Sequence, residues 1–185
     1  MLTPFHNRPE LGTLYEPLVG KTMLELGGKQ DGGRVYKPYF ESFGFKHTSV
    51  DWNGEFGALV MDLRKPLNLG TFDMVTNIGT SEHVSEKDYA GQIACWRNIL
   101  AAMHVGTVLI CDTPKPGYWK GHGTWYPQMT FYSELARLNG LKVERLLEND
   151  WRPDKPGRPV ISARLVMRES MPFVMPDRQH LFCST

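Results

Sequence analysis

The sequence has few cysteines and no excess of one charge sign, and both shortages exclude classes of protein. Its three cysteines are Cys95, Cys111 and Cys183. They are far apart and odd in number, so they form neither a CxxC metal motif nor the disulfide framework of a small secreted protein. Lysine and arginine number 21 against 20 acidic residues, a net charge of +1. This balance predicts no broad basic surface, so we do not expect binding to nucleic acid.

The chain also lacks an apolar run long enough to cross a membrane. Its first residues, MLTPFHNRPELG, contain charges and prolines where a signal peptide would need an apolar stretch. We therefore expect a cytoplasmic protein without a membrane partner, with reduced cysteines in or near its core. No internal repeat is found, and the length of 185 residues suits one domain, which we place at 1–185.

Apolar segments of strand length alternate with segments of helical spacing along most of the chain. Strands are expected at TMLELG, HTSVDW, ALVMDL, FDMVTNIG, GTVLICDTP, LKVERLL and VISARLVM, and helices at GRVYKPYFESFGF, EKDYAGQIACWRNILAAMH and FYSELARLNG. This order predicts a Rossmann-like, doubly wound α/β fold with a mainly parallel seven-stranded sheet. The last two strands follow one another without a helix, so one antiparallel strand is expected near the C-terminus, close to the end of the sheet.

We make a separate structural prediction for each of four further segments. Residues 1–20 predict a short helix or turn, and residues 170–185 a C-terminal tail. Residues 148–159, ENDWRPDKPGRP, are polar and rich in proline and predict a loop. The loop at residues 113–129 is rich in glycine, proline and aromatic side chains. Those aromatic residues predict either a wall or lid over a ligand or a cluster that fixes the loop to the body of the protein.

Polar residues and glycines follow the first four predicted strands, where ligands bind in sheets of this kind. The residues are Glu25, Gly27, Gly28, Asp51, Trp52, Asp62, Leu63 and Asn77. The glycine fingerprint of nicotinamide dinucleotide sites fails, because Lys29 and Gln30 stand where a second glycine is needed. A phosphate-binding GxxxxGK[ST] loop fails too, because Arg34 and Val35 follow Gly33.

A nucleoside without a phosphate suits the same residues better. The Asp51 carboxylate can accept hydrogen bonds from both ribose hydroxyls, and Trp52 can pack on adenine. Asp62 can accept a hydrogen bond from the exocyclic amine, with the Leu63 backbone beside the ring. Glu25 suits a cationic ligand. The combination fits S-adenosylmethionine, which carries an ammonium, a sulfonium, a ribose and an adenine.

The order of motifs resembles the class I S-adenosylmethionine-dependent methyltransferase family over roughly residues 20 to 170. The matching motifs are MLELGG, SVDWNG, VMDLRKPL, FDMVTNIGTSEHV and ILAAMHVGTVLICDTP. The resemblance implies that Glu25, Gly27 and Gly28 face the methionine part, and that Asn77 contacts it through a backbone carbonyl. It implies ribose binding by Asp51 and an adenine site framed by Asp62 and Leu63. The sequence departs from the family at Lys29, where many members have glycine.

The implied activity is methyl transfer from S-adenosylmethionine to an oxygen or nitrogen of a small-molecule acceptor, which leaves S-adenosylhomocysteine. The loop at 113–129 would lie on the acceptor side. Two alternatives stay open: a non-catalytic or partner-dependent subunit that binds S-adenosylmethionine, and a nicotinamide-dependent oxidoreductase. A protein partner or a homodimer is compatible with the sequence.

The candidate catalytic residues are Glu82, His83 and His122. Some methyltransferases bind a divalent metal through Glu-x-x-Glu-His after the fourth strand, but Gly79 occupies the position of the first glutamate here. Two adjacent side chains are too few ligands for Mg²⁺, so we predict no bound metal. We expect Glu82 to cap the following helix, and His83 to act as the general base, with His122 as the second candidate.

Overall fold

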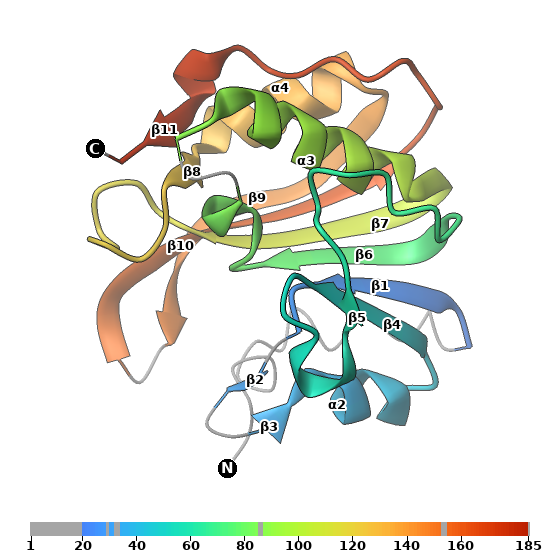
Figure 1. Cartoon of the computed structure of the whole chain (residues 1–185). Coiled ribbons are helices and arrows are strands. Elements are labelled where there is room, and N and C mark those ends of the chain that lie inside the picture. Colours follow the sequence, from blue (N-terminus) through green and yellow to red (C-terminus); the bar gives the residue numbers. More distant parts are fainter. Residues whose placement is uncertain (1–19, 29, 32–33, 85–86, 153–154, 185) are drawn as a thin grey trace.

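The computed structural model describes residues 20–28, 30–31, 34–84, 87–152 and 155–184. The predicted N-terminal helix or turn, residues 1–20, therefore falls outside the described residues except for Gly20, and Lys29 also lies outside them. A seven-stranded sheet forms the middle layer, in the order β5-β4-β1-β6-β7-β10-β9 (Figure 1). Its strands are β1 (Thr22–Leu26), β4 (Lys46–Asp51), β5 (Leu59–Val60), β6 (Phe72–Ile78), β7 (Met103–Pro114), β9 (Leu141–Arg152) and β10 (Lys155–Met167).

The sheet confirms the predicted α/β class with seven strands and corrects the place of the antiparallel pairing. Strands β5, β4, β1, β6 and β7 pair in parallel. Strand β10 pairs antiparallel with β7 on one side and with β9 on the other, so the antiparallel pairings lie inside the sheet. The physical reason is that β9 and β10 form an antiparallel hairpin, in which β9 runs along the outer edge and β10 lies between β9 and β7.

Residues 148–152 and 155–159 do not form a loop, as predicted, but belong to the outer parts of β9 and β10. Val160 pairs with Asn149, and Pro159 pairs with Asp150. The ladder is irregular between Lys155 and Pro159, and such irregularities are where strands accept proline. Pro156 and Pro159 therefore mark a disturbed strand end rather than the absence of a strand.

Within the described residues, three α-helices cover the two faces of the sheet. Helix α2 (Tyr36–Ser42) lies on one face, and α3 (Tyr89–Ala101) and α4 (Met129–Leu138) lie on the other (Figure 1). Helix α3 begins at Asp88, whose carboxylate accepts hydrogen bonds from the backbone N–H groups of Ala90 and Gly91. The prediction that Glu82 caps this helix is wrong, because Glu82 lies earlier, in the short 3₁₀ helix η3 (Ser81–His83).

Side chains that alternate along the strands divide the core between the two faces. The larger cluster packs the sheet against α3 and α4, where the Trp96 ring lies 4.8 Å from that of Phe131. The smaller cluster packs the opposite face against α2 and includes Phe40, Met23 and Met74. None of the described helices has the length and apolar character needed to cross a membrane.

The loop at 113–129 is tied to the C-terminal tail by a two-stranded sheet. Strand β8 (Trp125–Pro127) pairs antiparallel with β11 (Leu181–Cys183), which follows the 3₁₀ helix η4 (Arg178–His180). The side chains of Trp125 and Tyr126 are buried. These two aromatic residues thus fix the loop to the body, which was one of the two roles expected for them.

The cysteines give a simple test of this packing. Cys95 and Cys111 are fully buried, whereas Cys183 is partly exposed. Burial raises the pKa of the Cys95 thiol to about 12, and burial raises that of Cys111 as well. At pH 8 we expect Ellman's reagent to modify one thiol in the native protein and all three after denaturation, because only the thiolate reacts. Rapid modification of two or three thiols in the native protein would contradict the packing, and a Cys183→Ser variant identifies the reactive group.

Candidate functional site

A cleft with a volume of about 1320 Å³ lies at the carboxyl ends of the parallel strands. Its lining comes from the segments that follow β1, β4, β5 and β6, which the sheet order brings to one edge. Five of the eight residues predicted to bind the cofactor line this cleft, and so does His83. The five are Gly27, Asp51, Trp52, Asp62 and Leu63.

Asp51 connects the ends of β1 and β4. Its Oδ2 accepts a hydrogen bond from the Gly28 N–H at 2.8 Å, and its Oδ1 accepts one from the Asn53 N–H at 3.3 Å. Gly27 has a left-handed φ of +76°, a conformation that favours glycine. A Cβ at Gly28 would lie 2.8 Å from the backbone oxygen of Glu55. The glycine turn is therefore fixed by the fold itself and presents the Asp51 carboxylate at the cleft.

The loop after β5 forms another wall of the cleft. The Arg64 guanidinium donates to both oxygens of Asp62, with distances of 2.9 Å from Nε to Oδ1 and 2.8 Å from Nη2 to Oδ2. These hydrogen bonds hold the pKa of the Asp62 carboxyl below its ordinary value. The backbone oxygen of Leu63 accepts from the Asn98 amide at 2.9 Å, which ties this loop to α3. Trp52 is 80% exposed and offers an uncovered aromatic surface at the cleft.

Three predicted residues do not line the cleft. Glu25 is buried on β1, with its Oε2 3.0 Å from Nε2 of His47 on β4. The side chain of Asn77 is buried at the end of β6, where it exchanges hydrogen bonds with Ser81. Gly28 contacts the site through the hydrogen bond that its backbone N–H donates to Asp51. The expected contacts of Glu25, Gly28 and the Asn77 carbonyl with a methionine group stay predictions.

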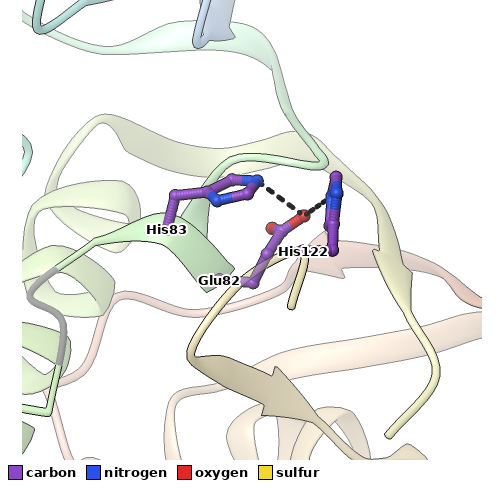
Figure 2. Close-up of side chains that lie close together, drawn as sticks. All are labelled: Glu82, His83 and His122. Atoms are coloured by element: carbon purple, nitrogen blue, oxygen red, sulfur yellow. Dashed lines mark ion pairs between the residues drawn. The ribbon is translucent and has the colours of Figure 1, made fainter. Parts of the chain in front are cut away.

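The three candidate catalytic residues lie together (Figure 2), and one of them, His83, lines the cleft. Oε1 of the buried Glu82 is 3.6 Å from Nε2 of His83 and 3.5 Å from Nε2 of His122. Both histidine side chains are about two-fifths exposed, and the two rings meet edge to face at 4.7 Å. His104 lies elsewhere, with its Nε2 3.8 Å from Asp73. A carboxylate beside two imidazoles can hold or move a proton.

The structure adds cleft residues that the sequence motifs did not single out. Thr80 follows β6, and its hydroxyl donates to the backbone oxygen of Leu26 at 2.6 Å, which joins the ends of β1 and β6. Met61, Lys87 and Asp88 also line the cleft. The polar run TNIGTS after an apolar strand was the one available signal for Thr80.

No protein-family model matches the sequence, and no curated protein sequence matches it. Solved structures do match. One is the N-methyltransferase NodS from Bradyrhizobium japonicum WM9 with S-adenosyl-L-homocysteine, with a TM-score of 0.67, 13% identity and coverage of 90% of this chain and 89% of that chain. Another is the 1,6-didemethyltoxoflavin-N1-methyltransferase of Burkholderia thailandensis, with a TM-score of 0.63, 16% identity and coverage of 88% and 78%.

A third similar structure is the O-methyltransferase NcsB1 from neocarzinostatin biosynthesis, with a TM-score of 0.54 and 15% identity. It was solved with S-adenosylmethionine and 2-hydroxy-5-methyl naphthoic acid, and the match covers 83% of this chain and 50% of that chain. These similarities show the fold. The chain has the fold of class I S-adenosylmethionine-dependent methyltransferases, as its sequence motifs predicted.

Proposed function

We propose that the protein is a methyltransferase that binds S-adenosylmethionine and methylates a small-molecule acceptor. The observation that carries this proposal is the cleft, where the Asp51 carboxylate, the glycine turn and the loop of Asp62 and Leu63 meet at one edge of the sheet. These are the groups that a nucleoside with a free ribose and no phosphate requires.

The lining residues suit the parts of this cofactor. Asp51 would accept hydrogen bonds from the ribose hydroxyls while Gly28 holds the carboxylate in place. Trp52 would pack on the adenine, and burial of its exposed ring would favour binding. Asp62 would accept a hydrogen bond from the exocyclic amine of the adenine. Because Arg64 already donates to both of its oxygens, that bond would use a remaining lone pair.

The size of the cleft leaves room for a second molecule. Pockets for one small ligand typically have volumes of about 300–1,000 Å³, and this cleft has about 1320 Å³. The similar methyltransferases support the small-molecule class: the Burkholderia thailandensis enzyme was solved with 1,6-didemethyltoxoflavin, and NcsB1 with a naphthoic acid. We propose an acceptor molecule that is methylated on either an oxygen or a nitrogen atom.

The residues beside the cleft fit the chemistry of methyl transfer. Bound S-adenosylmethionine supplies an activated methyl group, so the protein must mainly orient the acceptor nucleophile and exclude water. His83 lines the cleft, and Glu82 lies behind it with Oε1 3.6 Å from Nε2. His83 would accept the proton of the acceptor, and the Glu82 carboxylate would stabilise the imidazolium that forms. His122 is placed to serve as the alternative base.

Calorimetry and an activity assay test this function. We expect S-adenosylhomocysteine to bind with a stoichiometry of one per chain, and NADH not to bind. S-adenosylmethionine labelled in its methyl group should then transfer label to members of a pool of small phenols, acids and amines. Binding of NADH without binding of S-adenosylhomocysteine would contradict the proposal. Binding of S-adenosylhomocysteine without transfer to any pool would instead favour the non-catalytic or partner-dependent subunit.

A further inference from the structure

The Glu82 side chain is in an unusual environment for a carboxylate. It is fully buried, and neither of its oxygens has a hydrogen-bond partner among the described residues. Buried polar groups are nearly always hydrogen-bonded, because an ionised carboxylate loses its hydration when it is buried. A buried carboxylate with two open oxygens therefore indicates that another positively charged species belongs at this position.

The neighbouring atoms identify the kind of species. Nε2 of His83 and Nε2 of His122 lie 3.6 Å and 3.5 Å from the same oxygen, Oε1 of Glu82. All three ligand atoms lie within 4.8 Å of one another and converge on one space (Figure 2). Distances of this length are too long for good N–H···O hydrogen bonds, which are about 2.7–3.2 Å.

The same distances fit metal coordination. Two ligand atoms at about 2.1 Å from a tetrahedral ion are about 3.4 Å apart. Both carboxylate-to-imidazole distances match this spacing, so an ion would fit between Oε1 and each Nε2 with small side-chain adjustments. One carboxylate with two imidazoles is a ligand set for Zn²⁺ and similar transition metals, whereas Mg²⁺ prefers oxygen ligands only.

The backbone holds this cluster in place from both sides. The Thr124 N–H donates to the Glu82 backbone oxygen at 2.8 Å, which fixes the loop of His122 to η3. The Gln92 amide donates to the backbone oxygens of Ser81 and Val84, which fixes η3 to α3. A Cβ at Gly123 would lie 2.8 Å from Cγ of Glu82, so only glycine allows the loop to approach this closely. Ligands held by a fixed scaffold lose little freedom on binding a metal.

We propose that Glu82, His83 and His122 bind one divalent transition-metal ion of the Zn²⁺ class through Oε1 and the two Nε2 atoms. Three protein ligands leave at least one coordination position for water or for an oxygen of a small molecule, as in catalytic zinc sites. Because His83 also lines the cleft, the ion lies at the border of the ligand-binding space. The sequence prediction of no bound metal rested on two adjacent side chains, and the loop that carries His122 supplies the third.

The test is metal binding by tag-free protein that has been treated with a chelator and then dialysed. Calorimetric titration with Zn²⁺ should show one ion per chain, and titration with Co²⁺ should produce visible d–d absorption. Glu82→Gln keeps the size of the side chain, and His122→Asn alters a partly exposed loop residue. Each should weaken Zn²⁺ binding at least tenfold. The matched control is His104→Asn, another partly exposed histidine beside a carboxylate, which should bind Zn²⁺ like the unaltered protein.

Two results would overturn the metal site: no stoichiometric Zn²⁺ binding by the unaltered protein, or equal affinities in Glu82→Gln, His122→Asn and His104→Asn. Stronger binding of Mg²⁺ than of Zn²⁺ would also overturn the assignment to transition metals. With the ion bound, Nε2 of His83 and Nε2 of His122 are metal ligands and do not also act as the general base, but the metal site does not depend on the binding of S-adenosylmethionine. A protein that binds S-adenosylhomocysteine but not Zn²⁺ refutes only the metal site, and one that binds Zn²⁺ but not S-adenosylhomocysteine refutes only the proposed function.

Discussion

Replacement of Asp51 by alanine is expected to weaken S-adenosylhomocysteine binding at least tenfold. The variant removes the carboxylate that would accept the ribose hydroxyls, and it also leaves the Gly28 N–H without its acceptor. Hydrogen bonds to a charged group each contribute about 1.5–3 kcal/mol, and a tenfold change in affinity corresponds to about 1.4 kcal/mol. Isothermal titration calorimetry with S-adenosylhomocysteine measures the change.

Two further variants separate ligand binding from support of the glycine turn. Asp51→Asn keeps one oxygen that can accept from Gly28 but replaces the other with an amide donor, so affinity should stay low while the turn is restored. Asp177→Ala removes a carboxylate that also accepts from a backbone N–H, that of Gln179, but does not line the cleft. It should bind like the unaltered protein. Unchanged affinity in Asp51→Ala would remove the basis for the nucleoside site.

The replacement of His47 by leucine is expected to lower the free energy of unfolding by about 3 kcal/mol, because the buried Glu25 carboxylate loses the polar partner that His47 provides. The His47 ring is fully buried, lies 3.0 Å from the Glu25 carboxylate and stacks on Phe40 at 5.7 Å. Urea denaturation followed by circular dichroism measures the change. His104→Leu is the matched control, because its partly exposed ring lies 3.8 Å from Asp73 and should contribute less than about 0.5 kcal/mol.

The double variant Glu25→Leu/His47→Leu extends this test. An apolar pair often replaces a buried ion pair without loss, so the double variant should recover much of the stability lost by His47→Leu. If Glu25 also faces the ammonium of the cofactor, the recovered protein should still bind S-adenosylhomocysteine more weakly. A double variant no more stable than His47→Leu would show that the two side chains are not coupled.

The sequence predicted the part of the site that local patterns determine. An apolar segment followed by a polar residue marks the carboxyl end of a strand, and parallel strands place these ends at one edge. Asp51 and Asp62 were found in this way, and both line the cleft. The same reasoning placed Glu25 beside the ligand, but its orientation depends on His47, which belongs to a different strand.

The position of His122 could not be predicted, because it depends on contacts between distant parts of the chain. The loop reaches Glu82 through Thr124 and is fixed by the pairing of β8 with β11. The position of β10 was misjudged for a similar reason: a missing helix between two strands predicts a hairpin but does not say on which side the second strand inserts. The proline-rich segment at 148–159 was assigned from composition, which does not distinguish a loop from an irregular strand end.

The pairing of β8 with β11 has a consequence for synthesis on the ribosome. The hydroxyl of Ser184 donates to the Gly123 backbone oxygen at 3.0 Å, and β11 holds the residues that follow His122. The strands whose ends form the cleft are all translated much earlier. A nascent chain therefore contains every strand that borders the cleft before it contains β11, the strand that holds the loop of His122, so the two parts of the site are completed one after the other during synthesis.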